Sequence, residues 1–315
     1  MVLRPRVSAV IPTAGRPTLV VRAAKSALEQ TMRDLEVVVV LDGPDPETLT
    51  RLRSLVDPRL RVIELPDRAG PGAARNAGVR AARGSWIALL DDDDEWLPGK
   101  LEAQLEAARG SAVSRPVVAT RVRARSGRGE DPVWPLRLPD PGEPFSEYLF
   151  SRRTPFWGET LVHTSTLLVP RDLLLDLPFR EDLAKHEDLD WLVKALVRPD
   201  VGLEFVAGAE PLAIWSVDSG RARSSRRPDW RTGLAWLQSV RPFVTERAFS
   251  AFLLTWIAAD AARERSLPAI WRIPVAAFRH GRPRGFHLLL FFGIWLVPVG
   301  LRERLGRLRP PRGGA

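Results

Sequence analysis

The N-terminal part of the chain alternates short apolar runs with amphipathic stretches, and this alternation limits the folds open to it. A continuous β-branched run such as EVVVVLD is typical of a central parallel strand rather than a half-exposed one. The series predicts an α/β fold with a mainly parallel, doubly wound sheet flanked by helices. The expected strands are 7–13, 36–42, 60–65 and 85–90, and the expected helices are 16–30, 46–56 and 72–83.

A polar segment follows each of these predicted strands. Pro12 and Thr13 end the first strand, and Asp42 comes directly after the second. The segment PDRAGPG (66–72) follows the third strand, and four aspartates (91–94) follow the fourth. Open α/β sheets bind their ligands at the carboxyl ends of the strands. The sequence therefore predicts a binding site at this one edge of the sheet.

The four adjacent aspartates need an explanation, because like charges repel. Mg²⁺ and Mn²⁺ prefer oxygen ligands and often take one or two carboxylates together with substrate phosphates. In an extended segment Asp91 and Asp93 would face the same side and reach one ion together. The alternative is a solvated acidic turn that caps the next helix, a role we expect in part for Asp94 and Glu95.

The order of these motifs resembles glycosyltransferase family 2. The resemblance covers about Val7 to Val217 in order and spacing. The segments that carry it are VSAVIPTAGRP, VVVVLDGPD, GPGAARNAGVRAARGSWIALLDDDDEWLP and FREDLAKHEDLDWLVKAL. The resemblance implies the Rossmann-like GT-A fold. It also implies an inverting transfer of a sugar from a nucleoside-diphosphate sugar, with a UDP-sugar as the favoured donor and Mn²⁺ or Mg²⁺ as the cofactor.

The same resemblance assigns the donor-binding residues position by position. It implies that Pro12, Thr13 and Asp42 hold the nucleoside, and that Arg75 lies near the base or the phosphates. The family often has Tyr-Asn where this chain has Ala14-Gly15, so only a backbone contact is expected there. For Asp42 the alternative is a simple Asp-Gly turn, and for Arg75 a solvated charge on a helix.

For the aspartates the resemblance implies that Asp91 and Asp92 face the ribose and the sugar. It makes Asp93 the metal ligand, with Asp91 beside it as the second candidate.

A second acidic set, KHEDLDW, lies at a predicted helix start. Inverting transfer needs a base that takes the proton of the acceptor hydroxyl. A carboxylate suits this role where neighbouring charges and partial burial raise its pKa. The resemblance places the base at Asp188. The alternative is helix capping, which we expect for Glu187 or Asp190. We expect His186 to be an acceptor-site or structural residue.

The middle of the chain is less regular. PVVATRVRA (116–124) and TSTLLVP (164–170) predict one strand each. The arm at 126–144 and the stretch at 156–166 are expected to choose the sugar and the acceptor. An arginine-rich loop follows at 220–231, and its Arg221 or Arg223 would clamp a phosphate or stay solvated. The Gln-x-x-Arg-Trp motif of processive members of the family is absent.

These patterns predict a catalytic domain at 1–230, with a nucleotide-sugar half to about 115 and an acceptor half from about 116. A helical extension follows at 231–315. Within it, residues 285–301 are uncharged between two arginines, but they are short for a span and contain glycine and proline. Two interpretations stay open: an interfacial helix with arginines at anionic head groups, or a core helix helped by Trp256, Trp271 and Trp295.

Charge and composition limit the other classes. The chain has 315 residues, a net charge of +9 and no cysteine, which excludes disulfides and thiolate chemistry. The N-terminal segment has no signal-peptide pattern, so we expect a cytoplasmic enzyme, peripheral on the inner face of the plasma membrane. Its partner is then a glycan or lipid-linked acceptor in envelope or exopolysaccharide synthesis, with no nucleic acid. The alternatives are a basic nucleic-acid-binding protein and a haloacid-dehalogenase-like phosphatase, although the first strand ends in Pro-Thr rather than in a nucleophilic aspartate.

Overall fold

The computed structural model describes residues 4–126, 131–217, 229–297 and 301. The chain divides into two compact units, which are described separately. Unit 1 contains Met1–Trp134 and Val162–Arg221, and unit 2 contains Pro135–Leu161 and Ala222–Ala315. This division differs from the sequence-based boundary at 230, because Pro135–Leu161 and the residues from Ala222 onward are grouped with the C-terminal helices.

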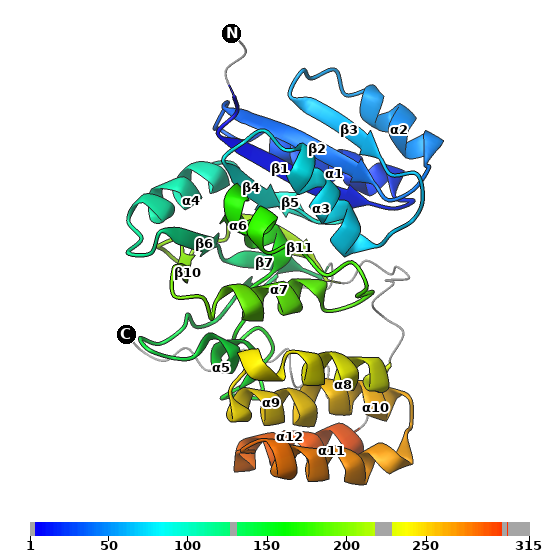
Figure 1. Cartoon of the computed structure of the whole chain (residues 1–315), viewed down its shortest axis with the longest axis vertical. Helices are drawn as coiled ribbons and strands as arrows, with labels where there is room; N and C mark the ends of the chain where they lie inside the picture. Colours follow the sequence, from blue (N-terminus) through cyan, green and yellow to red (C-terminus); the bar gives the residue numbers. More distant parts are fainter. Residues whose placement is uncertain (1–3, 127–130, 218–228, 298–300, 302–315) are drawn as a thin grey trace. The chain divides into compact units, whose positions relative to one another are not determined.

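Unit 1 is built on a seven-stranded sheet with the order β10-β6-β9-β4-β1-β2-β3 (Figure 1). All its neighbouring strands are parallel except β9, which runs antiparallel to β4 and β6. The mainly parallel α/β fold predicted from the sequence is confirmed. Its strands are β1 (Val7–Thr13), β2 (Leu35–Leu41), β3 (Leu60–Glu64), β4 (Trp86–Leu89), β6 (Arg115–Ala119), β9 (Leu168–Pro170) and β10 (Val201–Phe205).

Helices cover this sheet because the connections between its parallel strands β1 to β4 are helical. The helices α1 and α2 pack against each other beside β1 and β2, whereas α3 packs on the same strands together with α6 and α7. Every residue of β2 is buried, as its continuous apolar run predicts. The helices of unit 1 are α1 (Pro17–Leu28), α2 (Pro46–Arg53), α3 (Pro71–Ala81), α4 (Lys100–Arg109), α6 (Arg171–Asp176) and α7 (Glu187–Ala195), with a short 3₁₀ helix, η1 (Thr164–Thr166).

A smaller sheet in unit 1 has the order β5-β11-β7-β8. It corrects one expectation, because the segment 116–124 is two strands in two different sheets rather than one strand. A second expected strand, 164–170, is also shorter, since η1 occupies its first half. The strands of the smaller sheet are β5 (Glu95–Trp96), β7 (Val122–Arg125), β8 (Val133–Trp134) and β11 (Ala213–Ser216).

Unit 2 is helical. Its core contains the rings of Phe150, Trp236 and Phe252, with centroids 4.8–6.4 Å apart. The segment α5 (Phe145–Phe150) joins this core, and its Ser146 hydroxyl accepts a hydrogen bond from the Thr245 amide at 3.2 Å. The other helices are α8 (Trp230–Ser239), η3 (Arg241–Phe243), α9 (Glu246–Phe252), the π-helical η4 (Leu253–Ile257), α10 (Ala258–Arg263), α11 (Leu267–His280) and α12 (Gly285–Leu296).

The helix α12 is shorter than the uncharged segment from which it was predicted. No helix in the described ranges is both long enough and apolar enough to cross a membrane. The tryptophans invoked for a core helix differ in exposure: Trp271 is 77% exposed and Trp256 43%, while Trp295 is half-buried. The structure therefore gives no support to Trp271 as a core residue.

Candidate active site

The carboxyl ends of β1, β2 and β4 lie along one edge of the main sheet because these strands are parallel and adjacent. This edge brings together Thr13, Asp42 and the four aspartates, as the sequence predicts. The Asp42 carboxylate accepts hydrogen bonds from the amides of Ala69 at 2.7 Å and Gly70 at 3.1 Å. Asp42 therefore ties the end of β2 to the loop before α3, and that loop borders the site.

The four aspartates form a turn and not the extended segment that the sequence suggested. The Asp94 amide donates to the Asp91 carbonyl at 3.1 Å, which closes the turn. The argument that Asp91 and Asp93 share a side through strand alternation therefore does not hold. Their individual contacts decide what each carboxylate faces.

Two arginines neutralise this turn. Arg16, at the start of α1, lies 2.9 Å from Asp92 and 3.6 Å from Asp93. Arg75, in α3, lies 2.7 Å from Asp91. The repulsion among the carboxylates is thus relieved by the protein's own cations. Arg16 was not among the predicted site residues, although it stands inside the motif VSAVIPTAGRP.

Burial gives the aspartates of the turn different pKa values. Burial raises the pKa of Asp92 to about 6, and its carboxylate also accepts the Thr13 hydroxyl at 2.6 Å. Burial raises the pKa of Asp94 to about 7, where Ser165 and the Ser216 amide donate to it at 2.6 and 3.1 Å. For Asp91 burial acts in the same direction, but Arg75, together with His163 and Arg16, outweighs it and lowers the pKa. Asp91 is therefore the firmly ionised member beside two carboxyls that protonate more readily.

The Arg75 guanidinium is buried and bridges two carboxylates. It lies 2.7 Å from Asp91 and 2.7 Å from Glu187, the first residue of α7. Burial disfavours its charge, but the two carboxylates more than compensate and raise its pKa. Its centre also lies 5.6 Å from the Phe179 ring. Arg75 thus joins the acidic turn to the second acidic set, and the solvated alternative for it is wrong.

The three carboxylates at the start of α7 have different partners. Glu187 pairs with Arg75, and Asp190 lies 2.7 Å from Lys194 and 3.7 Å from Arg180. Asp188 accepts the Thr164 hydroxyl at 3.2 Å and is only half-buried. Within the described ranges it forms no ion pair. Asp188 is therefore the carboxylate of this set that is most open to a substrate.

The residue before α7 is itself unusual. His186 adopts φ 70° in the left-handed region, which is uncommon for a residue other than glycine. Its carbonyl accepts the Asp190 amide at 2.8 Å, which begins the helix. His186 thus sets the direction in which α7 presents Glu187 and Asp188, consistent with the structural role expected for it.

One group in the described residues offers three ligand atoms for a metal ion. Asp91, Asp94 and His163 each provide one atom, all within 4.8 Å of one another. The His163 Nδ1 accepts the Ser165 amide at 3.3 Å, and the ring lies against Trp215 with centroids 4.7 Å apart. Carboxylate and imidazole donors fit a divalent ion such as Mn²⁺. Asp93 is not a member of this group, and its carboxylate lies 3.6 Å from the Arg16 guanidinium.

His163 was not predicted as a metal ligand from the sequence. It lies about seventy residues after the aspartates in the chain, so no local spacing links them. The stretch 156–166 was assigned to acceptor choice, and His163 stands within it. The two arginines expected to clamp a phosphate, Arg221 and Arg223, lie outside the described residues.

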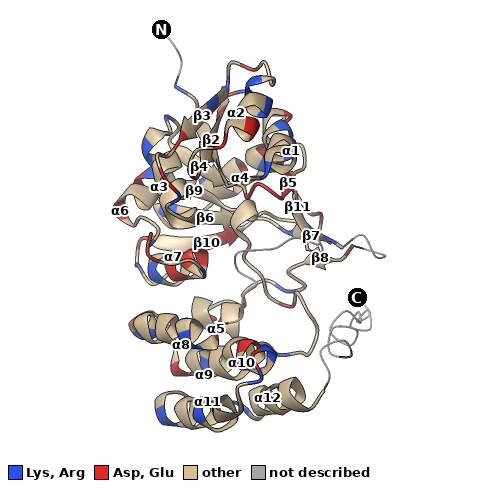
Figure 2. Ribbon diagram, turned by 90° about the vertical axis from the view of Figure 1, so that its right-hand side faces the viewer, with Lys and Arg blue, Asp and Glu red and all other residues tan. Residues whose placement is uncertain are grey.

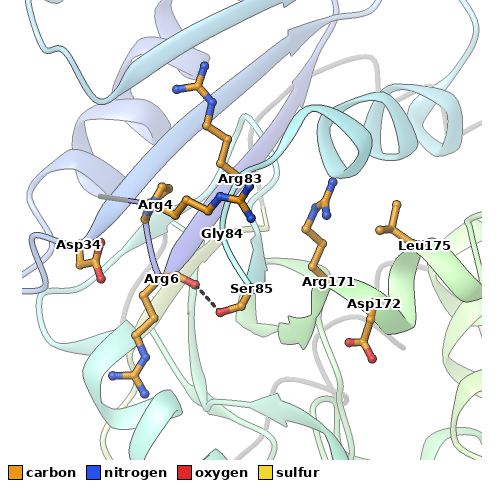
Figure 3. A pocket seen from close by; sticks show the side chains of 10 residues that line it. Arg4, Arg6, Asp34, Arg83, Gly84, Ser85, Arg171, Asp172 and Leu175 are labelled. Carbon is orange, nitrogen blue, oxygen red and sulfur yellow. Dashed lines mark hydrogen bonds between the residues drawn. The ribbon is translucent and has the colours of Figure 1, made fainter. Parts of the chain in front are cut away.

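A separate hollow of about 640 Å³ lies at the opposite edge of the main sheet (Figure 3). Arg6, Asp34 and Ser85 line it, and each precedes a strand whose other end borders the acidic turn. Arg4, Arg83 and Arg171 also line it. The hollow is therefore not part of the candidate active site.

Comparison with known proteins identifies the class. Residues 8–174 match the family described as glycosyl transferase family 2, so the chain belongs to this family and is a glycosyltransferase. One relative, the amylovoran biosynthesis glycosyltransferase AmsB of Erwinia amylovora, is 26% identical over 247 residues, which is 76% of this chain and 79% of that protein. Neither a nucleic-acid-binding protein nor a phosphatase is supported.

Two solved structures share the fold. TarS of S. aureus, solved in complex with UDP-GlcNAc, has a TM-score of 0.58 at 19% identity and covers 82% of this chain and 71% of its own. The mannosyltransferase PcManGT of Pyrobaculum calidifontis, solved with GDP-Man and Mn²⁺, has a TM-score of 0.57 at 19% identity. It covers 97% of this chain and 84% of its own. The GT-A fold expected from the sequence is confirmed.

Proposed function

We propose that the protein moves a sugar from a nucleoside-diphosphate sugar to an acceptor hydroxyl with inversion, in the synthesis of an envelope or exopolysaccharide glycan. The observation that carries the proposal is the convergence of the acidic turn and the start of α7 on the two ends of one guanidinium, Arg75. This contact puts a carboxylate-rich donor edge beside a base candidate. Membership of family 2 and the relative named for amylovoran biosynthesis support the class of product.

The donor site we propose lies along the carboxyl ends of β1, β2 and β4. Pro12, Thr13 and Asp42 would contact the nucleoside, with Asp92 at the ribose. Thr13 and Arg16 already hold the Asp92 carboxylate, so its position is fixed before the donor binds. The neighbours solved with UDP-GlcNAc and with GDP-Man support a nucleotide-sugar donor of this kind, with a UDP-sugar as the first to test.

We propose that a divalent ion, Mn²⁺ or Mg²⁺, assists the reaction. Asp91 and Asp93 are the ligands inferred from the sequence, and the alternative site is the group formed by Asp91, Asp94 and His163. When bound, the ion would neutralise the diphosphate that leaves with the bonding electron pair. A neighbour solved with GDP-Man and Mn²⁺ supports the use of such an ion.

Asp188 is the proposed base. Its carboxylate would take the proton of the acceptor hydroxyl as the oxygen forms a bond to the anomeric carbon and the bond from that carbon to the diphosphate breaks. Glu187 is held by Arg75, and Asp190 by Lys194, so neither competes for the acceptor proton in the structure. Thr164 donates to Asp188 and would orient it.

We also propose a lipid-linked or glycan acceptor and a peripheral contact of the C-terminal region with the inner face of the plasma membrane. The stretch at 285–301 and the arginines beside it support this contact. No nucleic-acid partner is proposed.

Calorimetric titration of UDP, GDP and dTDP, each with and without Mn²⁺, tests the donor proposal. We expect one nucleotide to bind and Mn²⁺ to increase its affinity. A panel of the corresponding nucleotide sugars, assayed for slow hydrolysis, then identifies the sugar. Binding of none of the nucleotides, together with tight and salt-sensitive binding of RNA, would contradict the proposal.

A further inference from the structure

Two helices of unit 2 expose large apolar side chains. Trp271 on α11 is 77% exposed and Leu296 on α12 is 78% exposed. A contiguous group of exposed large apolar side chains is unusual on a protein surface and often marks an interaction site. We name these residues the apolar face. Its members are Leu267, Trp271, Val275 and Phe278 on α11, and Leu289, Phe292 and Leu296 on α12.

On each helix these residues form one stripe. The spacing of 267, 271, 275 and 278 keeps them within an arc of about 80°, at about 100° per residue, and 289, 292 and 296 lie in an even narrower arc. The opposite sides are buried, with Ile273 and Ala277 on α11 and Phe291 on α12. The apolar face is therefore separate from the side of each helix that packs into the core.

Both helices bury their inner sides against the same layer. α11 packs on α9, η4 and α10, and α12 packs on η4 and α10. Figures 1 and 2 both show α11 and α12 together on one side of that layer. Their outward stripes consequently belong to one surface of unit 2.

The charge of this region has one sign. From Arg265 to Arg302 the sequence contains six arginines and no aspartate or glutamate. Arg272 and Arg279 are exposed on α11, about 40–60° around the helix from the nearer edge of the apolar stripe. Figure 2 shows basic residues on α11 and no acidic residue on either α11 or α12. The apolar face thus has a cationic border.

We infer that the apolar face of α11 and α12 lies on an anionic lipid surface, with Trp271 and Phe278 in the interface and Arg272 and Arg279 at the head groups. Lys and Arg beside an apolar helix face are typical of helices that lie in the membrane interface. At 1.5 Å per residue the two helices are about 21 and 18 Å long, shorter than the roughly 30 Å hydrocarbon layer, so they fit the interface and not a span.

A second copy of the chain is a poorer occupant. In a two-fold dimer the same surface meets itself, so the arginines of the border would face arginines without an acidic residue from this region to pair with them. Anionic lipid supplies the opposite charge. The inference specifies the proposed membrane contact by naming the helix faces and the charge of the lipid. Its biological role rests on the proposed function, in which the acceptor is lipid-linked.

Vesicle co-sedimentation of the full chain tests this inference. The probes are vesicles of phosphatidylcholine alone and of an equal mixture of phosphatidylcholine and phosphatidylglycerol, each at low and high salt. We expect binding to the anionic vesicles that weakens with salt, and much weaker binding to the neutral ones. Trp271→Ser/Phe278→Ser should lower the partition coefficient by about tenfold or more. Arg272→Gln/Arg279→Gln should lower it about fivefold per arginine on anionic vesicles alone.

Matched controls lie on unit 1. Val56→Ser replaces a side chain that is 98% exposed, and Arg33→Gln/Arg53→Gln removes two exposed charges. Both should leave vesicle binding unchanged. Circular dichroism verifies that each variant folds. If Trp271→Ser/Phe278→Ser does not fold, the lipid and salt dependence of wild-type binding tests the inference by itself.

The inference fails if the wild type binds neither vesicle, if it binds both equally at all salt concentrations, or if the controls lose binding as much as the variants. It also fails if ultracentrifugation without lipid finds a dimer that Trp271→Ser/Phe278→Ser dissociates. Vesicle binding is measured without nucleotide. If the wild type binds nucleotide but not vesicles, only this inference is overturned. If it binds vesicles but no nucleotide, only the proposed donor function is overturned.

Discussion

The guanidinium of Arg75 lies 2.7 Å from the carboxylate of Glu187, a residue 112 positions later in the sequence. The same guanidinium lies 2.7 Å from Asp91, so one buried side chain connects the two acidic segments of the site. Burial raises the pKa of Glu187, and Arg75 opposes this shift. The arrangement therefore depends on Arg75 for both its geometry and its charge balance.

Replacing Arg75 by Met should destabilise the fold by about 3–5 kcal/mol, because it leaves two largely buried carboxylates without their cation. Arg75→Lys should recover only part of the loss, since a single ammonium lacks the fork that reaches both carboxylates. Urea unfolding measures the change. The matched control is Arg80→Met on the same helix, where the side chain is 61% exposed and should cost about 0.5 kcal/mol or less. Equal effects of the two Met variants would show that the bridge contributes little.

The metal ligands can be assigned by comparing two variants. Asp93→Asn should reduce the Mn²⁺-dependent part of nucleotide affinity by about 10- to 100-fold, while the affinity without metal changes little. His163→Gln should retain the metal effect, because the His163 Nδ1 already accepts the Ser165 amide and Asp94 is occupied by Ser165 and Ser216. Calorimetry with and without EDTA measures both. The opposite pattern would transfer the metal site to Asp91, Asp94 and His163.

A glycine in α3 permits the close packing on which the site is built. A Cβ at Gly78 would clash with the Val10 Cγ1 and lie 3.2 Å from the Val40 Cγ2, so Gly78→Ala pushes the helix away from β1 and β2. We expect a loss of about 1–3 kcal/mol in stability, measured by urea unfolding. Gly293→Ala on α12 is the control, because nothing lies within 4 Å of its Cβ. It should stabilise the helix by up to about 1 kcal/mol, and similar losses for both would rule out the packing explanation.

These examples show what sequence patterns can and cannot predict here. The strands β1 to β4 and the helices between them are local patterns of apolar residues, so they were predicted close to their observed bounds. The division of 116–124 into β6 and β7 was not predicted, because the whole segment has the composition of a strand. Only the pairing with other strands assigns its two parts to different sheets. The bridge from Arg75 to Glu187 and the approach of His163 to Asp94 join distant segments, and no local spacing encodes either contact.

The side-chain amine of Lys100 is fully buried, and burial lowers its pKa well below the ordinary 10.5. It donates to the Gln104 amide oxygen at 2.7 Å and lies 4.2 Å from the centre of the Trp96 ring. Because the unfolded chain then binds a proton that the folded chain does not, stability rises with pH between the lowered pKa and 10.5. The rise amounts to about 1.4 kcal/mol per pH unit.

Lys100→Met removes this titration and keeps an unbranched chain over the Trp96 ring. Urea unfolding of both proteins at neutral and alkaline pH should therefore show the wild type gaining stability relative to Lys100→Met as the pH rises. Parallel pH curves would mean that Lys100 stays charged in the folded protein, held by the ring and by Gln104.

Asp188 and its neighbours should respond differently to the same conservative change. Asp188→Asn keeps the shape and the Thr164 contact but removes the basicity, so transfer should fall by about 10²- to 10⁴-fold. Donor affinity should stay near wild type, because a base acts on the acceptor and contributes in the transition state. Glu187→Gln should instead weaken the Arg75 bridge, and thus lower stability together with activity.

Asp190→Asn is the matched control at the same helix start. This variant removes the partner of Lys194, so it should lower the free energy of unfolding. The transfer rate and the donor affinity should both stay near wild type. If Asp188 only caps α7, Asn replaces it at a cost of a few tenths of a kcal/mol at most and transfer stays normal. Rates of transfer, nucleotide-sugar affinity and unfolding free energy, measured for the three variants, separate these cases. A folded Asp188→Asn protein with near-normal transfer removes Asp188 from the mechanism and makes Glu187, released from Arg75 when the acceptor binds, the next candidate.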